Sequence, residues 1–454
     1  MNFITFNFMN FLFTHTPLFY FIQSFWRDEA FSILLAQQPL SVIFQKTSVE
    51  PPVYYLLLHF WIKLFGTSEI AARSLSFIGF ALATIVVIEW AHILFKNHWL
   101  SKYTPLLFFL NPMLLYYAFE VRAYGWYIFF ATLSLFAYDQ KKWRLYRIAV
   151  ILGIYTHLYL GIIPFVHVIH YAWTKKRALY SRSASWRRGI SNFFKDPFVT
   201  SILIIGISFI PWIIRLFMEL GKFKNSWYFP VDFHLIRSVL GNMFLGYEGT
   251  PWYLWGWTQI LSVILFIFFC IACIPKQNRG KTVPLFLMIF IPLIIVISIS
   301  FVKPLFVNRY LIFVTIAQTV LLSYTIKSFS NTTYQKILAG CIFAGVIAFN
   351  IWYPLQHPKP DVRKTFQEVN LLKNPHDMIV ASDAIIFLET LYYAEDKKSV
   401  RLYNPKNVPF PWYIGETVFS PEYQISSFPT YPSRAFLIKP DGSYIMTYYL
   451  PENL

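Results

Sequence analysis

The amino-acid sequence predicts an all-α polytopic membrane protein with a small external α/β region at its C-terminal end. Of its 454 residues, 56% are hydrophobic, 20% are aromatic and only 13% are charged, whereas a soluble globular protein carries roughly 25% charged residues. Too little polar surface remains to cover a water-soluble protein of this length. Apolar runs recur through residues 1–355 and are absent from residues 356–454, so we divide the chain into a transmembrane domain and an external region at this point.

Eleven segments are apolar enough to serve as membrane spans, which need about 20 mostly apolar residues and fewer where a helix is shielded by protein. No small-residue cleavage site follows the first segment, so we expect it to be a retained anchor. Residues 146–173 fit either two short helices or one long helix. The segments are 4–25, 74–95, 103–119, 124–138, 146–158, 159–173, 198–217, 258–275, 283–301, 310–327 and 336–354.

Basic residues predict the orientation of these spans. The formal net charge is +17, but the Lys and Arg residues cluster in short segments between apolar runs, which indicates membrane topology rather than a nucleic-acid partner. With a cytoplasmic N-terminus, the densest cluster, Lys175 to Arg188, lies inside. This orientation in the plasma membrane places residues 26–72 and the C-terminal region on the outer face, with membrane lipids around the spans.

The cysteines give no sign of a structural metal site. Cys270 and Cys273 form a CxxC at the end of an apolar run, and Cys341 lies in another. A zinc site needs two further ligands nearby, so we interpret all three as small apolar residues. No cofactor is specified by the sequence, although a divalent metal could serve the site described below.

The sequence of the C-terminal region predicts a small structure that contains both strands and helix. MIVASDAIIFLETLYYA, at 378–394, predicts a strand followed by a helix. AFLIKPDG, at 435–442, predicts a strand followed by a turn. We expect a small α/β or loop-rich external cap.

Two carboxylates follow directly on the first predicted span. Asp28 and Glu29 open the segment RDEAFSILLAQQPL, whose apolar residues recur at helical spacing, so 29–40 predicts a helix along the membrane surface. At the N-terminus of that helix the carboxylates either cap it or serve catalysis. Farther along, Glu50 precedes Pro51-Pro52 and the start of a second interfacial helix; it is either an exposed loop carboxylate or part of the site.

Cationic residues occur at the outer ends of later spans. Glu120 and Arg122 interrupt two apolar runs, where charge is costly and marks either function or pairing. They could pair with each other, or Arg122 could extend to lipid headgroups. Lys303 and Arg309 lie in a short outer loop, where basic residues are uncommon. They therefore indicate an anionic partner, either a headgroup phosphate or a substrate phosphate. His157, in YTHLYLG, fits a structural histidine better than an acceptor or metal contact.

Together these charges suit transfer of a sugar from a polyprenyl phosphate. A carboxylate such as Asp28 can take the proton of an acceptor hydroxyl. The leaving phosphate is already a stable anion and needs fixed positive charge, which Arg122 and Arg309 could supply, rather than a general acid. One base with one group of cations implies a single displacement with inversion. The lipid carrier explains why such an enzyme would lie in a bilayer.

The order of these segments carries a family resemblance. RDEAFSILLA, EPPVYYLLLHFWIKLFGTSEIAARSLS, NPMLLYYAFEVRAYGWY, YTHLYLG and KPLFVNRYLIF follow one another over residues 1 to about 355. In this arrangement the sequence resembles the membrane glycosyltransferases of the GT-C fold. Within that fold it resembles in particular the protein O-mannosyltransferase and aminoarabinose-transferase-like group, glycosyltransferase family 39.

The resemblance implies a polyprenyl- or dolichyl-phosphate sugar donor and an external active site. It makes Asp28 the catalytic acidic residue, with Glu29 beside it. Arg122 with Tyr124 matches an E-x-R-x-Y stretch, and Arg309 with Tyr310 matches a late R-Y motif. Family members often carry Asp or His before the double proline, where this chain has Ser48 and Glu50, so a metal-ligand role is not carried over for that loop. The C-terminal region is not covered, so the acceptor is not implied.

Two other functions compete with the transferase. A lipid or oligosaccharide transporter, or flippase, would carry ionisable residues in mid-span and two related halves, whereas here Glu89 is the main charge at mid-depth and no internal repeat is visible. A non-catalytic subunit of an envelope assembly would tolerate loss of Asp28.

Overall fold

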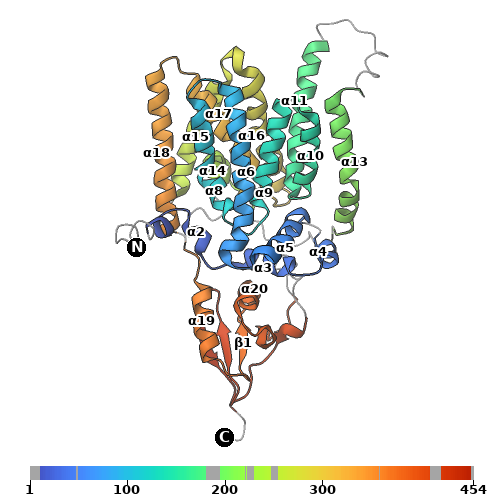
Figure 1. Cartoon of the computed structure of the whole chain (residues 1–454), viewed down its shortest axis with the longest axis vertical. Helices are drawn as coiled ribbons and strands as arrows, with labels where there is room; N and C mark the ends of the chain where they lie inside the picture. Colours follow the sequence, from blue (N-terminus) through green and yellow to red (C-terminus); the bar gives the residue numbers. More distant parts are fainter. Residues whose placement is uncertain are drawn as a thin grey trace.

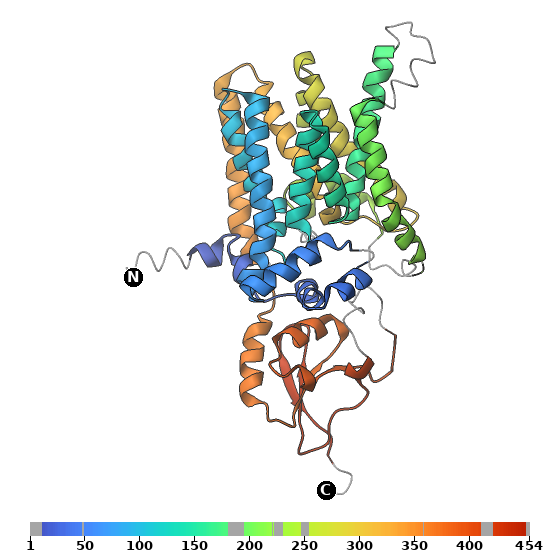
Figure 2. The same ribbon diagram turned by 45° about the vertical axis from the view of Figure 1, so that its right-hand side comes forward.

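The computed structural model describes residues 11–47, 50–179, 195–219, 221, 230–246, 254–356, 358–409 and 421–450. It has three layers: a bundle of long helices, a layer of short helices beneath one end of the bundle, and a mixed α/β region beneath that layer (Figures 1 and 2). Within the described residues, six helices are long and apolar enough to cross a membrane. The predicted fold class, a polytopic membrane protein with a small C-terminal α/β region, is confirmed.

The bundle is built around one helix that is buried along almost its whole length. This helix, α17 (Ile312–Lys327), has every residue from 312 to 326 buried. Helices at the periphery instead expose large apolar side chains such as Ile207, Ile264 and Ile337, as expected for surfaces that face lipid. The other bundle helices are α6 (Glu69–Phe95), α7 (Leu100–Phe109), α8 (Pro112–Ala118), α9 (Tyr124–Asp139), α10 (Trp143–Ile154), α11 (Ile162–Leu179), α13 (Pro197–Met218), α14 (Phe233–Phe244), α15 (Trp255–Cys273), α16 (Arg279–Ser300) and α18 (Thr332–Gln356).

The layer beneath the bundle contains the predicted interfacial helices. It consists of α2 (Phe19–Ile22), α3 (Arg27–Ala36), α4 (Leu40–Lys46) and α5 (Val53–Phe65). Pro39 and Pro52 precede the first residues of α4 and α5, where a missing N–H does no harm. Gly66, with φ of 83°, ends α5 in a conformation that favours glycine. These turns hold the short helices across the lower end of the bundle (Figure 2).

The C-terminal region is a five-stranded sheet with two helices. The strand order is β3-β2-β1-β4-β5, with parallel pairing except between β4 and β5. The strand and helix predicted in 378–394 are β1 (Met378–Ala381) and α20 (Ala384–Tyr393), and the strand predicted in 435–442 is β4 (Ala435–Ile438). The remaining elements are α19 (Val362–Leu372), β2 (Val400–Tyr403), β3 (Gln424–Ile425) and β5 (Tyr444–Thr447). Since α18 ends at Gln356, the region begins where the apolar runs stop; its independence as a domain stays a prediction.

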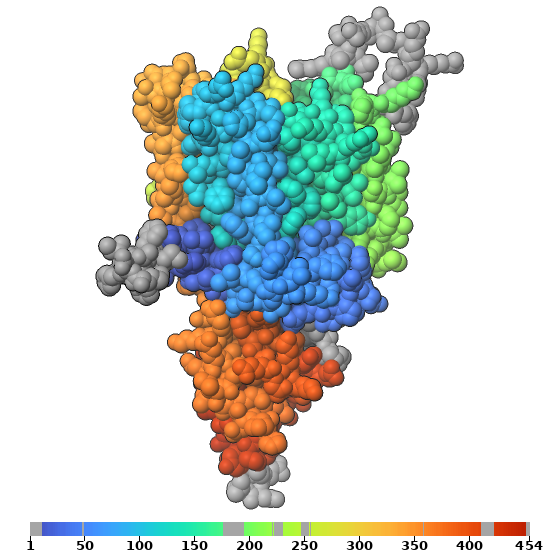
Figure 3. All heavy atoms as spheres, viewed as in Figure 1, coloured from blue at the N-terminus to red at the C-terminus, as the bar shows by residue number. Residues whose placement is uncertain are grey.

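The C-terminal region is firmly attached to the interfacial layer. Ala30 and Leu34 of α3 belong to the same apolar core as Val362, Phe366 and Leu391 of the C-terminal region. The space-filling view shows the two layers in contact across the visible face (Figure 3). Helix α3 is therefore covered by residues from the end of the chain.

Several elements differ from the sequence-based expectations. Eleven spans were predicted, whereas six of the described helices are long and apolar enough to cross a membrane. The predicted span 103–119 is divided at Leu110 and Asn111 into the short helices α7 and α8.

The first predicted span, 4–25, is not one helix in its described part: residues 11–15 and α2 are short helical pieces separated by a turn at Thr16 and Pro17, and residues 23–25 are extended. Proline disfavours helix at the preceding residue, which accounts for the break. Residues 1–10 lie outside the described residues, so the retained anchor and the cytoplasmic N-terminus stay predictions.

A further difference is α14, which lies between the predicted spans 198–217 and 258–275 and was not predicted as a helix of the bundle. Its residues 238–244 are buried, and its carbonyls accept hydrogen bonds from side chains of neighbouring helices. Thr315 Oγ1 donates to Met243 O, and Asn111 Nδ2 donates to Phe244 O at 2.9 Å. Residues 146–173, for which two alternatives were open, form two helices, α10 and α11, joined by a short 3-10 turn.

Candidate active site

The site is built around the first turn of α3, where three charged residues follow one another. Trp26 precedes the helix in an extended conformation, and Arg27, Asp28 and Glu29 form the first turn. Carboxylates are stabilised at a helix N-terminus by the unpaired backbone N–H groups and the helix dipole. Although adjacent in sequence, Asp28 and Glu29 face different surroundings.

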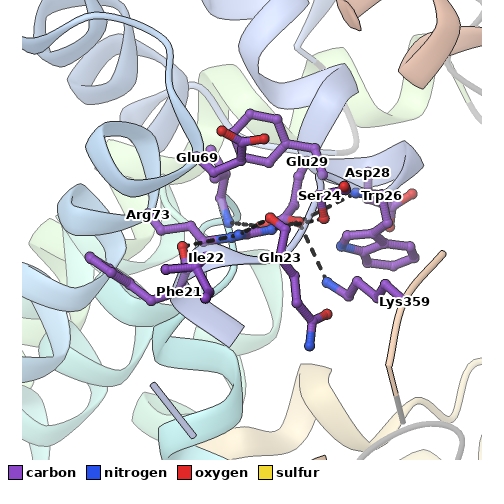
Figure 4. Close-up of polar contacts among 12 residues, drawn as sticks. Phe21, Ile22, Gln23, Ser24, Trp26, Asp28, Glu29, Glu69, Arg73 and Lys359 are labelled. Carbon is purple, nitrogen blue, oxygen red and sulfur yellow. Dashed lines mark hydrogen bonds and ion pairs between the residues drawn. The ribbon is translucent and has the colours of Figure 1, made fainter. Parts of the chain in front are cut away.

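Glu29 is fully buried and its carboxylate is saturated with partners. Arg73 of α6 binds both carboxylate oxygens, from Nε to Oε1 at 2.8 Å and from Nη2 to Oε2 at 2.7 Å. Val121 N–H donates to Oε1 at 3.0 Å, and Lys359 Nζ lies 3.5 Å from Oε2 (Figure 4). Burial raises the pKa of Glu29, but Arg73 and Lys359 outweigh it and hold the pKa below its usual range. Whether Glu29 is catalytic stays a prediction, and this geometry favours a positioning role.

Asp28 lies at the edge of the site with its side chain 15% exposed. Its Oδ1 accepts a hydrogen bond from Arg27 Nε at 3.0 Å, and its Oδ2 lies 3.9 Å from Arg309 Nη2. Burial raises its pKa, but the charges of Arg122, Arg27 and Arg309 outweigh burial and lower it. Asp28 is therefore an ionised carboxylate at neutral pH with residual access to solvent.

Arg309 joins the downstream part of the chain to this turn. It lies in the 3-10 turn Asn308–Leu311 that precedes α17. Its guanidinium carbon is 5.9 Å from the Trp26 ring, 6.0 Å from the Tyr124 ring and 5.9 Å from the Tyr310 ring. Aromatic faces stabilise a cation by their quadrupole, so these rings hold the guanidinium beside Asp28.

Arg122 is held by the loop that precedes α5. Its guanidinium pairs with the Glu50 carboxylate, which also accepts a hydrogen bond from Tyr55. Arg122 thus pairs with Glu50, and the alternative of a pair with Glu120 is wrong. The Glu50 side chain is 43% exposed, so this ion pair marks the open side of the site.

The aromatic rings beside Arg309 pack against further aromatic side chains. His157 stacks on Tyr127 at 4.5 Å between ring centroids and lies 5.1 Å from Tyr310 and 6.0 Å from Tyr124. The Tyr127 hydroxyl donates to the Tyr310 carbonyl at 2.8 Å. The His157 Nδ1 atom is buried and has no hydrogen-bond partner among the described residues.

The structure thus brings most of the predicted residues together and adds others. Asp28 and Arg309 are in contact, and Arg122 acts on Asp28 electrostatically. Tyr124 and Tyr310 face Arg309, and His157 packs against both of these rings. Glu120 is buried beside them, with Lys359, Glu29 and Arg309 among its electrostatic neighbours. Lys303 follows the last turn of α16, and its part in the site stays a prediction.

Sequence reasoning missed Arg73 and Lys359. Arg73 lies near the start of an apolar helix. An arginine at such a position can lie at the membrane boundary or form a buried ion pair, and the sequence does not distinguish the two. Lys359 lies in a charged region with no motif. Among the described residues, no group of three or more His, Cys, Asp or Glu side chains is arranged to hold a metal ion.

Comparison with solved structures identifies the fold. No known family model matches the sequence, and no curated protein matches it. The structure is similar to crystal structures of ArnT from Cupriavidus metallidurans: the apo state has a TM-score of 0.59 at 11% identity, and the undecaprenyl phosphate complex has a TM-score of 0.58 at 12% identity. Each superposition covers 96% of this chain and 92% of ArnT. This chain has the ArnT fold.

The similarity extends beyond the bundle. Because it covers nearly all of both chains, it includes the interfacial helices and the C-terminal region together with the long helices. The GT-C membrane fold predicted from the resemblance is confirmed, while the assignment to glycosyltransferase family 39 stays a prediction.

Proposed function

We propose that this protein is an integral membrane glycosyltransferase. It takes a sugar from a polyprenyl-phosphate carrier and transfers it to a hydroxyl of a lipid, glycan or protein acceptor at the outer face of the membrane. The observation that carries this proposal is the contact between Asp28 and Arg309, 3.9 Å apart, which joins a base and a cation at one end of the bundle. The ArnT fold, and the undecaprenyl phosphate bound in one ArnT structure, support the lipid-linked donor.

The carboxylate and the arginines act on different partners in the reaction: the carboxylate on the acceptor and the arginines on the phosphate. Asp28, ionised and partly exposed, takes the proton of the acceptor hydroxyl as its oxygen attacks the anomeric carbon. The donor must therefore separate the Asp28–Arg309 pair and enter between the two side chains, because the bond to the phosphate breaks on the face opposite to the attacking oxygen. Arg309 and Arg122 then stabilise the phosphate that leaves. A single displacement inverts the anomeric configuration.

The distribution of basic residues supports an external site. Lys96, Lys141, Lys142 and Lys281 lie at or near the helix ends opposite to α3, at the upper end of the bundle in Figure 1. Since Lys and Arg are enriched on the cytoplasmic side, the end that holds Asp28 and the C-terminal region faces outward.

Replacement of the proposed base tests the function directly. We expect Asp28→Asn to lower turnover by about 10²-fold or more, the scale of general-base catalysis, because the amide cannot accept the proton. Purified protein in lipid nanodiscs would be incubated with a panel of polyprenyl-phosphate sugars and candidate acceptors, and released polyprenyl phosphate measured by mass spectrometry. Asp396→Asn is the matched control, since Asp396 caps a turn on the exposed surface of the C-terminal region. Wild-type turnover by Asp28→Asn, or no carrier release by the wild type on any donor, contradicts the proposal.

Replacement of Arg309 tests the assignment of the leaving-group side. We expect Arg309→Ala to raise the KM for the lipid donor and lower turnover, with a smaller effect on the acceptor KM, because the phosphate loses a charge-assisted partner. The control is Arg401→Ala, since Arg401 is a partly exposed arginine of β2 that bonds nearby carbonyls. Unchanged donor kinetics would remove Arg309 from the site.

A further inference from the structure

Several buried polar atoms beside the site lack hydrogen-bond partners among the described residues. They are both amide atoms of Gln23, Oε2 of Glu120 and Nε1 of Trp26. The Gln23 and Glu120 residues are only 7% and 3% exposed. A buried polar group without a partner costs about 1–3 kcal/mol, and most buried polar groups in folded proteins are paired. Such a concentration points to a ligand that completes the pairing.

These atoms gather around Lys359. The Lys359 ammonium lies 5.3 Å from the Trp26 ring centroid and is the leading stabilising charge on the Glu120 carboxylate. The Gln23 main-chain carbonyl accepts a hydrogen bond from Arg73 at 2.6 Å, while its side chain extends away from the Arg73–Glu29 pair, on the same side as Lys359 (Figure 4). We call Gln23, Trp26, Glu120 and Lys359 the polar cluster.

The polar cluster adjoins the proposed chemistry and reaches the surface. Glu120 interacts electrostatically with both Arg309 and Asp28. The Lys359 and Asp28 side chains are 20% and 15% exposed, so the cluster has an open edge at these two residues. A molecule that separates the Asp28–Arg309 pair and places its reacting carbon between the two side chains would therefore bring its neighbouring atoms to the polar cluster.

We propose that the polar cluster binds the ring hydroxyls of the donor's sugar, and that this sugar is uncharged. The inference rests on the proposed function and adds the class of sugar to it. The chemistry of the cluster fits hydroxyls, which both donate and accept hydrogen bonds. The Gln23 amide offers both roles, Lys359 and Trp26 donate, and Glu120 accepts.

The surrounding charge argues against an amino sugar. Arg309 and Lys359 flank Trp26, and the Glu29 carboxylate is already bound by Arg73. Burial raises the pKa of Glu120 to about 7, so at neutral pH this carboxyl is only partly ionised. The other ionised carboxylate nearby, Asp28, is paired with Arg27 and Arg309. An ammonium group on the sugar would therefore meet two cations and no unpaired, fully ionised carboxylate, which disfavours its binding.

The experiment separates the sugar from its carrier. Binding of undecaprenyl phosphate, undecaprenyl-phosphate glucose, undecaprenyl-phosphate mannose and an undecaprenyl-phosphate aminopentose would be measured for the full-length protein in nanodiscs. We expect a neutral hexose donor to bind more tightly than the aminopentose donor. We also expect Gln23→Leu and Glu120→Leu each to weaken binding of the neutral donor about tenfold, because each loses roughly one to two hydrogen bonds. Binding of undecaprenyl phosphate should change less than about twofold.

A stability measurement distinguishes ligand binding from a structural role. Because Gln23 has no amide partner in the described structure, Gln23→Leu should leave the melting temperature unchanged or raise it, whereas a structural glutamine would lose stability. Gln38→Leu, at an exposed position after α3, is the control. Unchanged neutral-donor binding in both variants, or tighter aminopentose binding by the wild type, overturns the inference but leaves the transferase proposal standing if Asp28 and Arg309 behave as predicted. Failure of the wild type to bind any of the lipids overturns both.

Discussion

At the scale of single residues, the Arg73–Glu29 pair organises the site. Besides Glu29, the Arg73 guanidinium donates to the carbonyls of Phe21, Gln23 and Ser24, and it lies 5.0 Å from the Phe25 ring. One arginine of α6 thereby fixes the extended segment before α3. A bidentate, planar group is needed for this, so lysine cannot replace it fully.

We predict that Arg73→Leu destabilises the protein by about 3–5 kcal/mol, because it leaves the Glu29 carboxylate buried without its main partner. The double variant Arg73→Leu with Glu29→Leu should recover part of this loss, since it removes the isolated charge. Thermal unfolding in nanodiscs, followed by fluorescence-detected size exclusion, measures both. If the double variant is no more stable than the single one, the carboxylate is not the cause.

The residues of the candidate site differ in how well the sequence indicated them. Asp28 and Arg309 stood out because a charge at the outer end of an apolar segment costs free energy and marks either pairing or function. Gln23 was not, because it lies inside a segment that read as a span and becomes informative only when its amide is seen to lack partners. Lys359 was not predictable because it reaches the site only through the docking of the C-terminal region.

At the scale of elements, close helix contacts position the charged loop. A Cβ atom added to Gly125 of α9 would lie 2.0 Å from the carbonyl oxygen of Ser76 on α6. The Ser76 hydroxyl in turn donates to the Arg122 carbonyl at 3.1 Å. Since small residues allow helix backbones to approach closely in membranes, this crossing of α6 and α9 sets the position of Arg122.

We predict that Gly125→Ala destabilises the protein by about 1–3 kcal/mol, because the atom it meets belongs to the backbone and cannot move aside alone. Turnover should fall with it, as the Arg122 loop shifts. Gly206→Ala on α13 is the control, since nothing lies within 4 Å of the added atom. Equal melting temperatures for the two variants would contradict the packing argument.

The sequence predicted those helices that consist of one long apolar run. The long spans α6, α13, α15, α16, α17 and α18 match continuous apolar runs. Helix α14 was missed because His234, Arg237 and Asn242 break its apolar pattern. Its burial depends on partners such as Thr315 and Asn111 that lie far away in the sequence. When distant side chains provide the hydrogen bonds of a helix in this way, the sequence of the helix itself gives little indication that it is buried.

At the scale of the whole molecule, the C-terminal region is part of the site's architecture. The Tyr393 hydroxyl accepts from Phe25 N–H at 2.7 Å and donates to Glu69 Oε1 at 2.8 Å. Ser24 Oγ donates to Asp361 Oδ1 at 2.6 Å, and Arg363 Nη1 lies 3.3 Å from Glu69 Oε1. These contacts hold the segment just before Asp28 between the bundle and the sheet.

We predict that docking of this region weakens as pH rises. Glu389 of α20 is 7% exposed and faces Arg27 and Asp28 of α3. Burial outweighs the attraction of Arg27 and raises its pKa to about 8. The neutral carboxyl is thus favoured when docked. Docking loses stability as pH rises from the usual carboxyl range, about 4.3, through about 8, and levels off above that.

Hydrogen exchange of α3 and α20 measures this effect. Protection should be lower at pH 8.5 than at pH 6 after correction for intrinsic exchange rates, and Glu389→Gln should remove most of the difference because the amide does not ionise. The exposed Glu422→Gln in the same region is the control. A pH dependence that is identical in Glu389→Gln and the wild type would rule out Glu389 as its source.

The contacts of Asp361, Arg363 and Tyr393 with residues 24–69 also determine when the enzyme can first work. They join the first sixth of the chain to the last quarter, so they cannot form while the ribosome is still making the bundle. A nascent or truncated chain that has inserted all its helices would still hold the turn around Asp28 without its cover. On the proposed function, sugar transfer would therefore begin only after synthesis of the chain is nearly complete, which would protect the lipid-linked donor from unfinished copies of the protein.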